Sequence, residues 1–231
     1  MLVKWETLPD KMKTETVKEY YDILSKRRSS LFIKRLFDLV LSMIMIVVLS
    51  PILLFLSVWI KIDSEGPVFY RQVRVTTGGR EFRIFKFRTM VVNADKIGAL
   101  ITAEHDPRIT KVGNKLRKCR LDELPQLFNI FVGDMSFVGT RPEVSKYVNV
   151  YTDEMNATLL LPAGVTSLAS VNYKDEDEVM AEYTSKGIST DEAYGRYVLP
   201  DKMKYNLDYL KKFSICGDIK LMLKTVVSVL M

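Results

Sequence analysis

Two adjacent carboxylates, Asp122 and Glu123, are the side chains of this sequence whose type and spacing best suit chemistry. They follow a run of basic residues in the segment RKCRLDELPQLFN. Pro125 suits the first turn of a helix, so a helix is predicted over residues 122–131 with Asp122 near its N-cap. The partial positive charge of a helix start, together with the nearby cations, favours a carboxylate and a phosphate at the same place.

Such a carboxylate pair could carry out phosphoryl transfer. An ionised Asp122 with Arg117 beside it could attack phosphorus and form an acyl phosphate. Glu123 could hold Mg²⁺, which a diphosphate substrate requires for charge neutralisation. A single Asp-Glu dipeptide is a weak signal, and an ordinary Asp N-cap followed by a first-turn Glu is the plainer interpretation.

Two other segments offer cations that could bind phosphate. In VGTRPE, residues 138–143, Gly139 and Pro142 predict a tight loop that projects Arg141, and a guanidinium can hold phosphate through two parallel hydrogen bonds. In KFRTM, residues 86–90, Lys86 and Arg88 come at the end of a predicted strand. A structural ion pair of Arg141 and a solvated basic strand end are the alternatives.

The composition excludes several other kinds of site. With one His and two Cys in 231 residues, a three-His or four-Cys zinc site is impossible and a disulfide framework is not expected. Cys119 and Cys216 are predicted to be free thiols in a reducing compartment. His105 is the one histidine available to a catalytic triad, and it lies in an ordinary loop-like stretch. No GxGxxG or Walker A motif is present.

The net charge of +6 is distributed unevenly along the chain. Residues 26–120 carry 19 basic and 7 acidic side chains, whereas residues 121–200 carry 5 basic and 13 acidic ones. A basic block of this size indicates an anionic partner such as nucleic acid, anionic lipid or a phosphorylated substrate, or else a solvated face.

A long apolar segment precedes the candidate catalytic residues. From Leu39 to Ile60 there are 22 residues without a charge, which is enough to cross a bilayer as a helix. Ser50 and Pro51 lie in its middle, where proline bends a helix and serine can bond a freed carbonyl. Both flanks are basic, so both ends are predicted on the cytoplasmic side. We therefore expect a broken helix that enters and leaves on one face; a kinked single span is the alternative.

The remaining pattern predicts a mostly helical α+β domain with a small hairpin. The apolar runs at residues 68–75 and 81–87 flank Thr77, Gly78 and Gly79, which predicts a hairpin. The alternation slips at Ile84–Phe85, which predicts a bulge or a strand end there. Further helices are expected over residues 13–26, 90–100, 112–118, 175–187 and 200–210. The amphipathic tail, residues 218–231, is expected at the membrane interface or packed on the domain.

The order of these motifs resembles the bacterial sugar transferase family of small monotopic phosphoglycosyl transferases. The matching elements, over about residues 31–223, are RLFD, the apolar segment with Ser-Pro, GPVFYRQVRV, KFRTM, LDELPQLFN, GDMSFVGTRPE and VLPDKMKYNLDYL. The resemblance implies transfer of a sugar 1-phosphate from a UDP-sugar to a polyprenyl phosphate, typically undecaprenyl phosphate, with release of UMP. Such a reaction is the first membrane step of a bacterial surface glycan pathway.

The same resemblance implies roles for individual residues. Asp122 would be the nucleophile that carries a covalent phosphosugar, and Glu123 would bind Mg²⁺ or tune Asp122. Arg117 and Arg141 would hold phosphate, with Lys86 and Arg88 as further substrate-binding residues. Ser50 and Pro51 would break a re-entrant membrane helix.

These expectations divide the chain into three regions and predict the cellular location of the catalytic domain. Residues 1–30 are predicted as a charged helical extension, residues 31–62 as the re-entrant helix, and residues 63–231 as a catalytic domain on the cytoplasmic face of the bacterial inner membrane. Anionic lipids are expected partners, a homodimer is a possible assembly, and nucleic acid is not an expected partner.

Two other functions are consistent with parts of the pattern. The first is a non-catalytic, membrane-anchored adaptor whose basic region binds anionic lipid or nucleic acid. The second is an inactive family member that serves as an assembly partner, which the intact Asp122–Glu123 pair disfavours. Neither has a motif of its own in this sequence, and the transferred sugar is left open.

Overall fold

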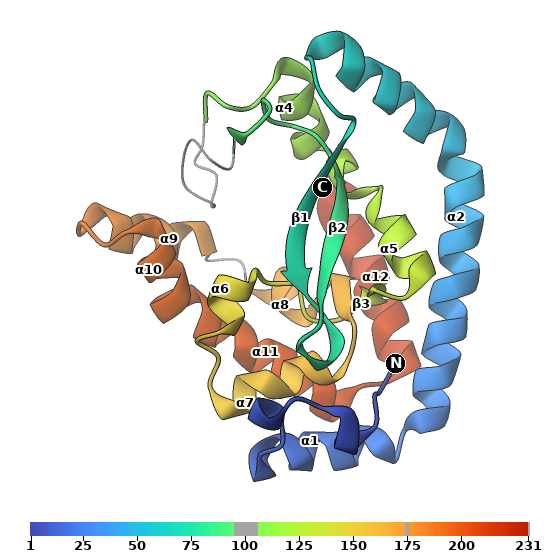
Figure 1. Cartoon of the computed structure of the whole chain (residues 1–231), viewed down its shortest axis with the longest axis vertical. Helices are drawn as coiled ribbons and strands as arrows, with labels where there is room; N and C mark the ends of the chain where they lie inside the picture. Colours follow the sequence, from blue (N-terminus) through green and yellow to red (C-terminus); the bar gives the residue numbers. More distant parts are fainter. Residues whose placement is uncertain (95–105, 174–175, 231) are drawn as a thin grey trace.

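The computed structural model describes residues 1–94, 106–173 and 176–230 (Figure 1). These residues form many helices and two small sheets, in agreement with the predicted α+β class. The helices are α1 (Glu15–Ser25), α2 (Arg28–Asp63), α4 (Lys111–Lys118), α5 (Gln126–Val132), α6 (Ser145–Val148), α7 (Asp153–Asn156), α8 (Leu168–Asn172), α9 (Glu176–Ser185), α10 (Thr190–Ala193), α11 (Leu199–Lys212) and α12 (Ile215–Leu230), and the strands are β1 (Phe69–Val75), β2 (Glu81–Phe87), β3 (Met135–Val138) and β4 (Ala163–Thr166). His105 and most of the helix predicted over residues 90–100 lie outside the described residues.

The strands β1 and β2 form the predicted hairpin. They are antiparallel, with Phe69 opposite Phe87 and Val75 opposite Glu81. The turn contains Gly78 and Gly79 at φ values of 67° and 75°, a region that glycine reaches without a steric penalty.

The prediction of a bulge or a strand end at Ile84–Phe85 is wrong, because regular pairing continues through both residues to Phe87. The alternation slips for another reason, namely that both faces of β2 are covered at this point. Ile84 is buried in the main core, and the Phe85 ring packs against Phe128 of α5 with ring centroids 5.8 Å apart. Two consecutive apolar residues are therefore compatible with a regular strand here.

The second sheet is a short parallel pair, β3 and β4, which the sequence pattern did not indicate. Met135 pairs with Ala163 and Val138 with Thr166, and all of β3 is buried. The backbones of the adjoining loops approach closely, since a Cβ on Gly164 would lie 2.1 Å from the backbone nitrogen of Gly139. This close approach requires glycine at position 164. Gly139, on the other side of the contact, begins the loop that carries Arg141.

The first 30 residues contribute side chains to the main hydrophobic core. Helix α1 is capped by Thr14, whose hydroxyl accepts a hydrogen bond from the Val17 N–H at 3.3 Å, in agreement with the predicted helix over residues 13–26. Its buried face packs in the same cluster as residues of α5, β3, β4 and α11. Residues Leu8 and Met12 join this cluster ahead of the helix.

Helix α2 is a single 36-residue helix that continues through Pro51 and bends as it passes around one side of the fold (Figure 1). Proline cannot donate a hydrogen bond to the carbonyl of Val47, four residues earlier. The hydroxyl of Ser50 donates to this same carbonyl at 2.8 Å. The serine therefore satisfies the carbonyl that proline leaves free, as predicted. The predicted break of the helix at Ser50–Pro51 is wrong, because α2 continues through both residues and bends without an interruption.

Much of α2 is apolar and exposed. It is long and apolar enough to cross a membrane, and only 11% of its most apolar window is buried in the protein. Exposed side chains occur on both sides of Pro51, including Val47, Val48, Leu54 and Phe55, each at least 64% exposed. The helix thus presents a surface suited to a bilayer rather than to a soluble core.

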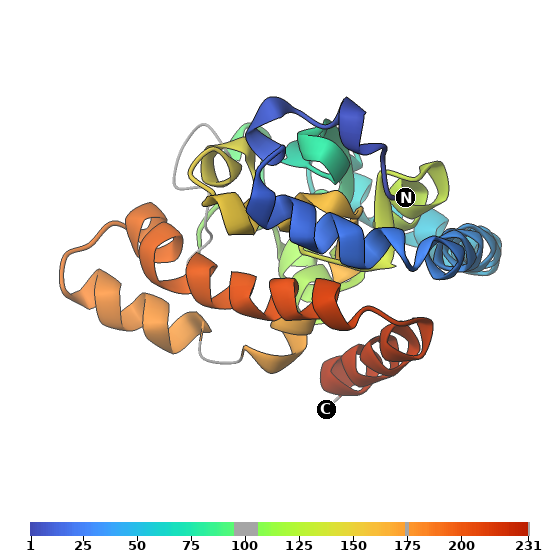
Figure 2. The same ribbon diagram turned by 90° about the horizontal axis from the view of Figure 1, so that it is seen from below.

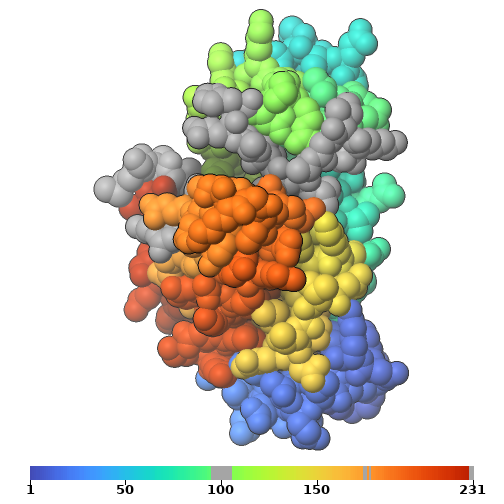
Figure 3. Space-filling view, turned by 90° about the vertical axis from the view of Figure 1, so that its left-hand side faces the viewer, coloured from blue at the N-terminus to red at the C-terminus, as the bar shows by residue number. Residues whose placement is uncertain are grey.

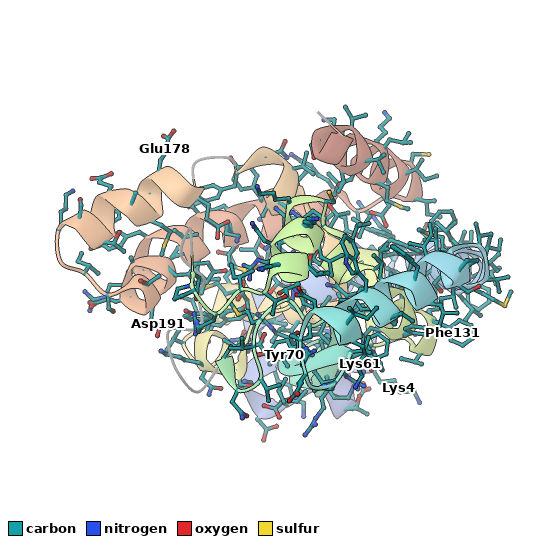
Figure 4. The ribbon with its side chains drawn as sticks, turned by 90° about the horizontal axis from the view of Figure 1, so that it is seen from above. Lys4, Lys61, Tyr70, Phe131, Glu178 and Asp191 are labelled. Carbon is teal, nitrogen blue, oxygen red and sulfur yellow. The ribbon has the colours of Figure 1, made fainter. Side chains whose placement is uncertain are left out.

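Three polar side chains in the first half of α2 attach it to the rest of the protein. Arg35 donates to the carbonyls of Ile130 and Phe131 at the end of α5, at 2.7 and 2.8 Å. Asp38 accepts a hydrogen bond from the backbone N–H of Phe137 in β3 at 3.3 Å. Lys34 forms a buried ion pair with Asp218 of α12 at 2.5 Å. Figure 4 shows Phe131 beside α2.

Two helices of the acidic segment, α9 and α10, lie away from α2. Helices α9 and α10 project on the opposite side of the fold, as Figure 2 shows, and Glu178 and Asp191 mark them in Figure 4. From that side, α9 to α11 cover the middle of the surface, with the α4 region at one end and the N-terminal helices at the other (Figure 3). The helices predicted over residues 175–187 and 200–210 are present as α9 and α11, and the described part of the amphipathic tail predicted at residues 218–231 belongs to α12.

Candidate active site

The chain reverses direction at Arg120, immediately before the two carboxylates. Arg120 has a left-handed backbone conformation with φ of 55°, and Leu121–Glu123 form a short 3₁₀ turn. Pro125, not Asp122, is at the N-cap of α5, so the predicted N-cap position of Asp122 is wrong. The left-handed residue permits a tighter turn, in which Glu123 N–H donates to the Arg120 carbonyl at 3.3 Å, before the α-helix begins.

Glu123 holds two cations from different parts of the fold. Its Oε1 accepts hydrogen bonds from Lys86 Nζ of β2 and from an Nη of Arg141, each at 2.9 Å. Burial favours the neutral carboxyl, but the charges of Arg141 and Lys86 outweigh burial and hold the pKa of Glu123 well below its usual range. Glu123 is therefore an anion that joins β2 to the Arg141 loop.

Asp122 lies beside this ion-pair cluster without a salt bridge of its own among the described residues. Burial raises the pKa of its carboxyl, and the negative charge of Glu123 raises it further, while Lys86 and Arg117 act in the opposite direction. A partly buried carboxylate that is not neutralised by a direct cation is a stronger nucleophile than one held in an ion pair.

The environment also acts on Lys86. Burial lowers the pKa of its ammonium group in spite of the attraction of Glu123. An anion that enters the site would therefore stabilise the charged form of Lys86. It is one of the residues that the sequence pattern assigned to substrate binding.

The loop that carries Arg141 is held on several sides. The carbonyl of Thr140 accepts from Gly164 N–H at 2.8 Å, and the carbonyl of Glu143 accepts from Val75 N–H at 3.0 Å. The side chain of Glu143 accepts from the Tyr194 hydroxyl at 2.6 Å. The predicted rigid loop is thus present, and it fixes the position of Arg141.

Arg74 is a residue of the site that sequence reasoning missed. It donates to the Pro142 carbonyl at 3.1 Å and to Gln72 at 2.7 Å, which connects β1 with the Arg141 loop. Tyr70, Gln72 and Arg74 alternate along β1 and all line the cleft. Period-two spacing of polar residues in VFYRQVRV was the available signal, since such residues share one face of a strand.

Arg88 has a different use from the phosphate contact expected of it. Its guanidinium donates to the carbonyl of Ser64 at 2.7 Å and to the carbonyl of Glu65, just beyond the end of α2. The side chain is buried, and a Cβ on Gly66 would lie 2.0 Å from its Nη1. Arg88 therefore lines the cleft but secures the end of α2 to β2.

These residues surround a cleft of about 710 Å³, a size that suits a small-molecule ligand. Its described lining is strongly basic. Asp122 and Glu123 are its acidic residues, and the basic residues are Arg74, Lys86, Arg88, Arg108, Arg117, Lys118, Arg120 and Arg141. Such a lining favours a multiply charged anion next to Asp122. The cleft brings together all six residues that the sequence assigned to catalysis or substrate binding.

The donor groups fit Mg²⁺ only if the substrate supplies most of its ligands. The described residues contain no group of three or more His, Cys, Asp or Glu side chains arranged for a metal ion. Mg²⁺ is commonly bound by one or two carboxylates together with substrate phosphates and water. Asp122 and the second oxygen of Glu123, which has no hydrogen bond to the described residues, provide such a partial set.

Comparison with known proteins identifies a family to which this chain is similar. The model of the family described as bacterial sugar transferase matches residues 29–231. The UDP-N-acetylgalactosamine-undecaprenyl-phosphate N-acetylgalactosaminephosphotransferase of Aeromonas hydrophila is 36% identical over 202 residues, which cover 86% of this chain and 44% of that protein. The undecaprenyl-phosphate galactose phosphotransferase of Salmonella typhimurium is 33% identical over 215 residues, which cover 86% of this chain and 40% of that protein.

A third relative has a similar length. The uncharacterized sugar transferase EpsL of Bacillus subtilis is 33% identical over 202 residues, which cover 87% of this chain and 88% of that protein. The chain thus spans less than half the length of the Aeromonas and Salmonella relatives but most of the Bacillus one.

Proposed function

Because the chain belongs to the bacterial sugar transferase family, we propose that it transfers a sugar 1-phosphate from a UDP-sugar to undecaprenyl phosphate and releases UMP. The Aeromonas and Salmonella relatives are named for N-acetylgalactosamine and galactose respectively, with undecaprenyl phosphate common to both names. The shared lipid supports the proposed acceptor, whereas the differing sugars leave the donor open.

One observation carries the proposal. Asp122 lies in a basic cleft beside a second carboxylate, Glu123, that is already neutralised by Lys86 and Arg141. The charge of Asp122 is thus kept for reaction, while the surrounding cations can bind a diphosphate.

In the first step, a carboxylate oxygen of Asp122 attacks the β-phosphorus of the UDP-sugar. The bond from this phosphorus to the bridging oxygen breaks, and UMP leaves with the bonding electrons. Lys86, Arg117 and Arg141 stabilise the negative charge on the phosphoryl oxygens. The product is an acyl phosphate that links Asp122 to the sugar.

In the second step, a phosphate oxygen of the lipid attacks the same phosphorus. The bond between phosphorus and the Asp122 oxygen breaks, and the carboxylate is restored. A water-soluble donor and a lipid acceptor can therefore use one small cleft in turn.

We include Mg²⁺ in the proposal, which Glu123 would hold together with the phosphates of the donor. When bound, the ion would neutralise negative charge on the diphosphate. Arg141 and Lys86 keep Glu123 ionised, and only the ionised carboxylate binds a cation well.

The proposed topology is a re-entrant α2 that enters and leaves the bilayer on the cytoplasmic face. Basic residues flank the apolar segment on both sides, with Lys34 and Arg35 before it and Lys61 after it. The hydrogen bond from Ser50 to Val47 supports a bent helix in lipid, where a free carbonyl would be costly. This topology keeps the cleft on the side where nucleotide sugars are made.

The direct test is UMP release by the detergent-solubilised protein with Mg²⁺, undecaprenyl phosphate and a panel of UDP-sugars. We expect UMP from at least one sugar and loss of at least 1,000-fold in Asp122→Asn, in line with other covalent nucleophiles. UMP release before the lipid is added, in an amount close to one per protein, would support the covalent step.

Two results would contradict the proposal. Full activity of Asp122→Asn excludes Asp122 as the nucleophile. A folded protein that releases no UMP and acquires no phosphosugar on Asp122 from a bacterial extract is not a transferase, and the adaptor, which no observation in the structure favours, then becomes the better hypothesis.

A further inference from the structure

Arg120 is a cation of the cleft for which the proposed reaction has no role so far. It lies two residues before Asp122, lines the cleft and is exposed to solvent. Its side chain makes no hydrogen bond or ion pair with the described part of the chain. Arg120 is therefore available to a ligand.

Most other cations of the cleft already hold partners in the protein. Lys86 and Arg141 bind Glu123, and Arg74, Arg88 and Arg108 bind side chains or carbonyls around the cleft wall. Among the described lining residues, three basic side chains have neither a hydrogen bond nor an ion pair: Arg117, Lys118 and Arg120. A dianionic phosphate that enters the cleft can meet these groups without breaking an existing pair.

The backbone at Arg120 is in a conformation that arginine seldom adopts. Its φ of 55° and ψ of 18° place it in the left-handed region, directly after the C-cap residue of α4. Glycine or asparagine is the usual residue at such a position, because a Cβ is strained there. An arginine is thus present where glycine or asparagine would be more stable.

We propose that Arg120 is a phosphate-binding residue of the cleft, placed at its mouth by the left-handed turn that also begins the Asp122 segment. The inference rests on the proposed function, which brings two phosphate ligands to this cleft. The phosphate is either that of the UDP-sugar donor or that of the lipid acceptor, and the chemistry of recognition is the same for both.

Variants of Arg120 can separate binding from folding. Arg120→Asn and Arg120→Gly remove the cation and suit the left-handed backbone, so their thermal midpoints should equal or exceed that of the parent protein. Arg120→Lys retains the charge without the two-pronged donor geometry. Lys111→Ala is the matched control, because it removes an exposed cation from α4 that does not line the cleft.

The binding measurement uses two probes on the whole protein. Calorimetry with UDP, and with uridine as the phosphate-free control, reports the donor phosphate. Binding to lipid nanodiscs with and without undecaprenyl phosphate reports the acceptor phosphate. We expect Arg120→Asn and Arg120→Gly to bind one of the two phosphates about 10- to 100-fold more weakly, as for loss of a charged hydrogen bond. Arg120→Lys should lose less, and Lys111→Ala and uridine binding should not change.

The outcomes distinguish this inference from the proposed function. Weaker UDP binding assigns Arg120 to the donor, and weaker lipid binding assigns it to the acceptor. If the parent protein binds both phosphates and the Asn and Gly variants bind them equally well, the inference is wrong while the proposed function stands. If the parent binds neither UDP nor undecaprenyl phosphate, the proposed function fails and this inference fails with it.

Discussion

Asp63, the last residue of α2, accepts a hydrogen bond at 3.1 Å from the backbone N–H of Val112, in the first turn of α4. Arg88 binds the same end of α2 from β2. The apolar helix is thus joined to two of the elements that carry cations into the cleft, namely α4 with Arg117 and β2 with Lys86. The position of α2 and the shape of the cleft are therefore mechanically connected.

The first prediction tests this connection through Gly66. In Gly66→Ala the new Cβ meets Arg88 Nη1 at 2.0 Å, and φ of 121° adds backbone strain. We expect a loss of about 2–4 kcal/mol, combining strain with forced displacement. The thermal midpoint should fall by about 2–4 °C for each kcal/mol, and UMP release should fall with it.

Gly187→Ala is the control for this variant. Gly187 also has a positive φ, at 82°, but nothing lies within 4 Å of its Cβ position. It should show the strain cost alone, about 1 kcal/mol, with normal UMP release. Equal effects of the two substitutions would contradict the role of the Arg88 contact.

The second prediction concerns the stability of Asp122→Asn. Because burial raises the pKa of this carboxyl above its ordinary value of 3.8, the unfolded chain releases the proton at a lower pH than the folded one. Ionised Asp122 therefore destabilises the fold once the pH exceeds the ordinary value, by an amount that becomes constant above the raised pKa. At pH 7 we expect Asp122→Asn to be more stable than the parent, with a thermal midpoint about 2–4 °C higher for each kcal/mol of stability gained. This difference should vanish below about pH 4.

Thermal unfolding from pH 3 to 8 measures this difference directly. Activity of the parent should decline as the pH falls through the raised pKa, since protonated Asp122 cannot attack phosphorus. A variant that is less stable than the parent at pH 7 would show that Asp122 has a stabilising, structural role.

The third prediction separates metal binding from ion pairing at Glu123. Glu123→Gln removes a metal ligand and both ion pairs, so we expect a loss of about 100-fold in UMP release and about a tenfold higher Mg²⁺ concentration at half-maximal rate. Arg141→Lys disturbs one ion pair but leaves the carboxylate, so its rate should fall while its Mg²⁺ requirement stays unchanged. An unchanged Mg²⁺ requirement in Glu123→Gln would remove Glu123 from the metal site.

Sequence patterns predicted elements whose signals are local. The hairpin follows from alternation around Gly78–Gly79, and the helix predicted over residues 13–26 is present as α1. Ser50 could be matched to the carbonyl freed by Pro51 because the three positions lie within one turn of helix. These are interactions between residues close in sequence.

The misjudged features depend on distant partners or on a backbone conformation that residue type does not predict. Arg88 binds carbonyls 23 and 24 residues away, so its sequence neighbours gave no sign that its guanidinium was occupied. The four-residue strands β3 and β4 are too short for a period-two signal. Asp122 was placed at an N-cap because Pro125 favours a helix start, whereas the left-handed Arg120 inserts a 3₁₀ turn that no residue type at that position predicts.

The fourth prediction concerns the topology of α2. Single cysteines at exposed sites near its two ends, Phe32→Cys and Ile62→Cys, should both react with an impermeant thiol reagent only after the cytoplasmic face is opened. The background must carry Cys119→Ser and Cys216→Ser, because both native thiols are exposed. Reaction of either introduced cysteine in intact cells, from the outer face of the inner membrane, would make α2 a true span.

The fifth prediction concerns the buried ion pair between Lys34 and Asp218, whose side chains are 4% and 8% exposed. Tyr209 also donates to Asp218, at 3.0 Å. Removing one partner leaves an unpaired buried charge, so Lys34→Met or Asp218→Leu should cost about 3–5 kcal/mol. The double variant should recover most of this loss, as measured by thermal unfolding in detergent. Additive losses would indicate that the two charges do not depend on each other.

The same pair also imposes an order on biosynthesis. Lys34 and Asp218 are 184 residues apart, so Lys34 leaves the ribosome long before its partner has been translated. In the proposed topology, α2 would meet the lipid bilayer during this interval with an uncompensated ammonium group next to its apolar segment, and water or lipid headgroups would have to solvate that group. The ion pair can form only after the residues of α12 have been synthesised, so in the proposed topology it would follow the insertion of α2.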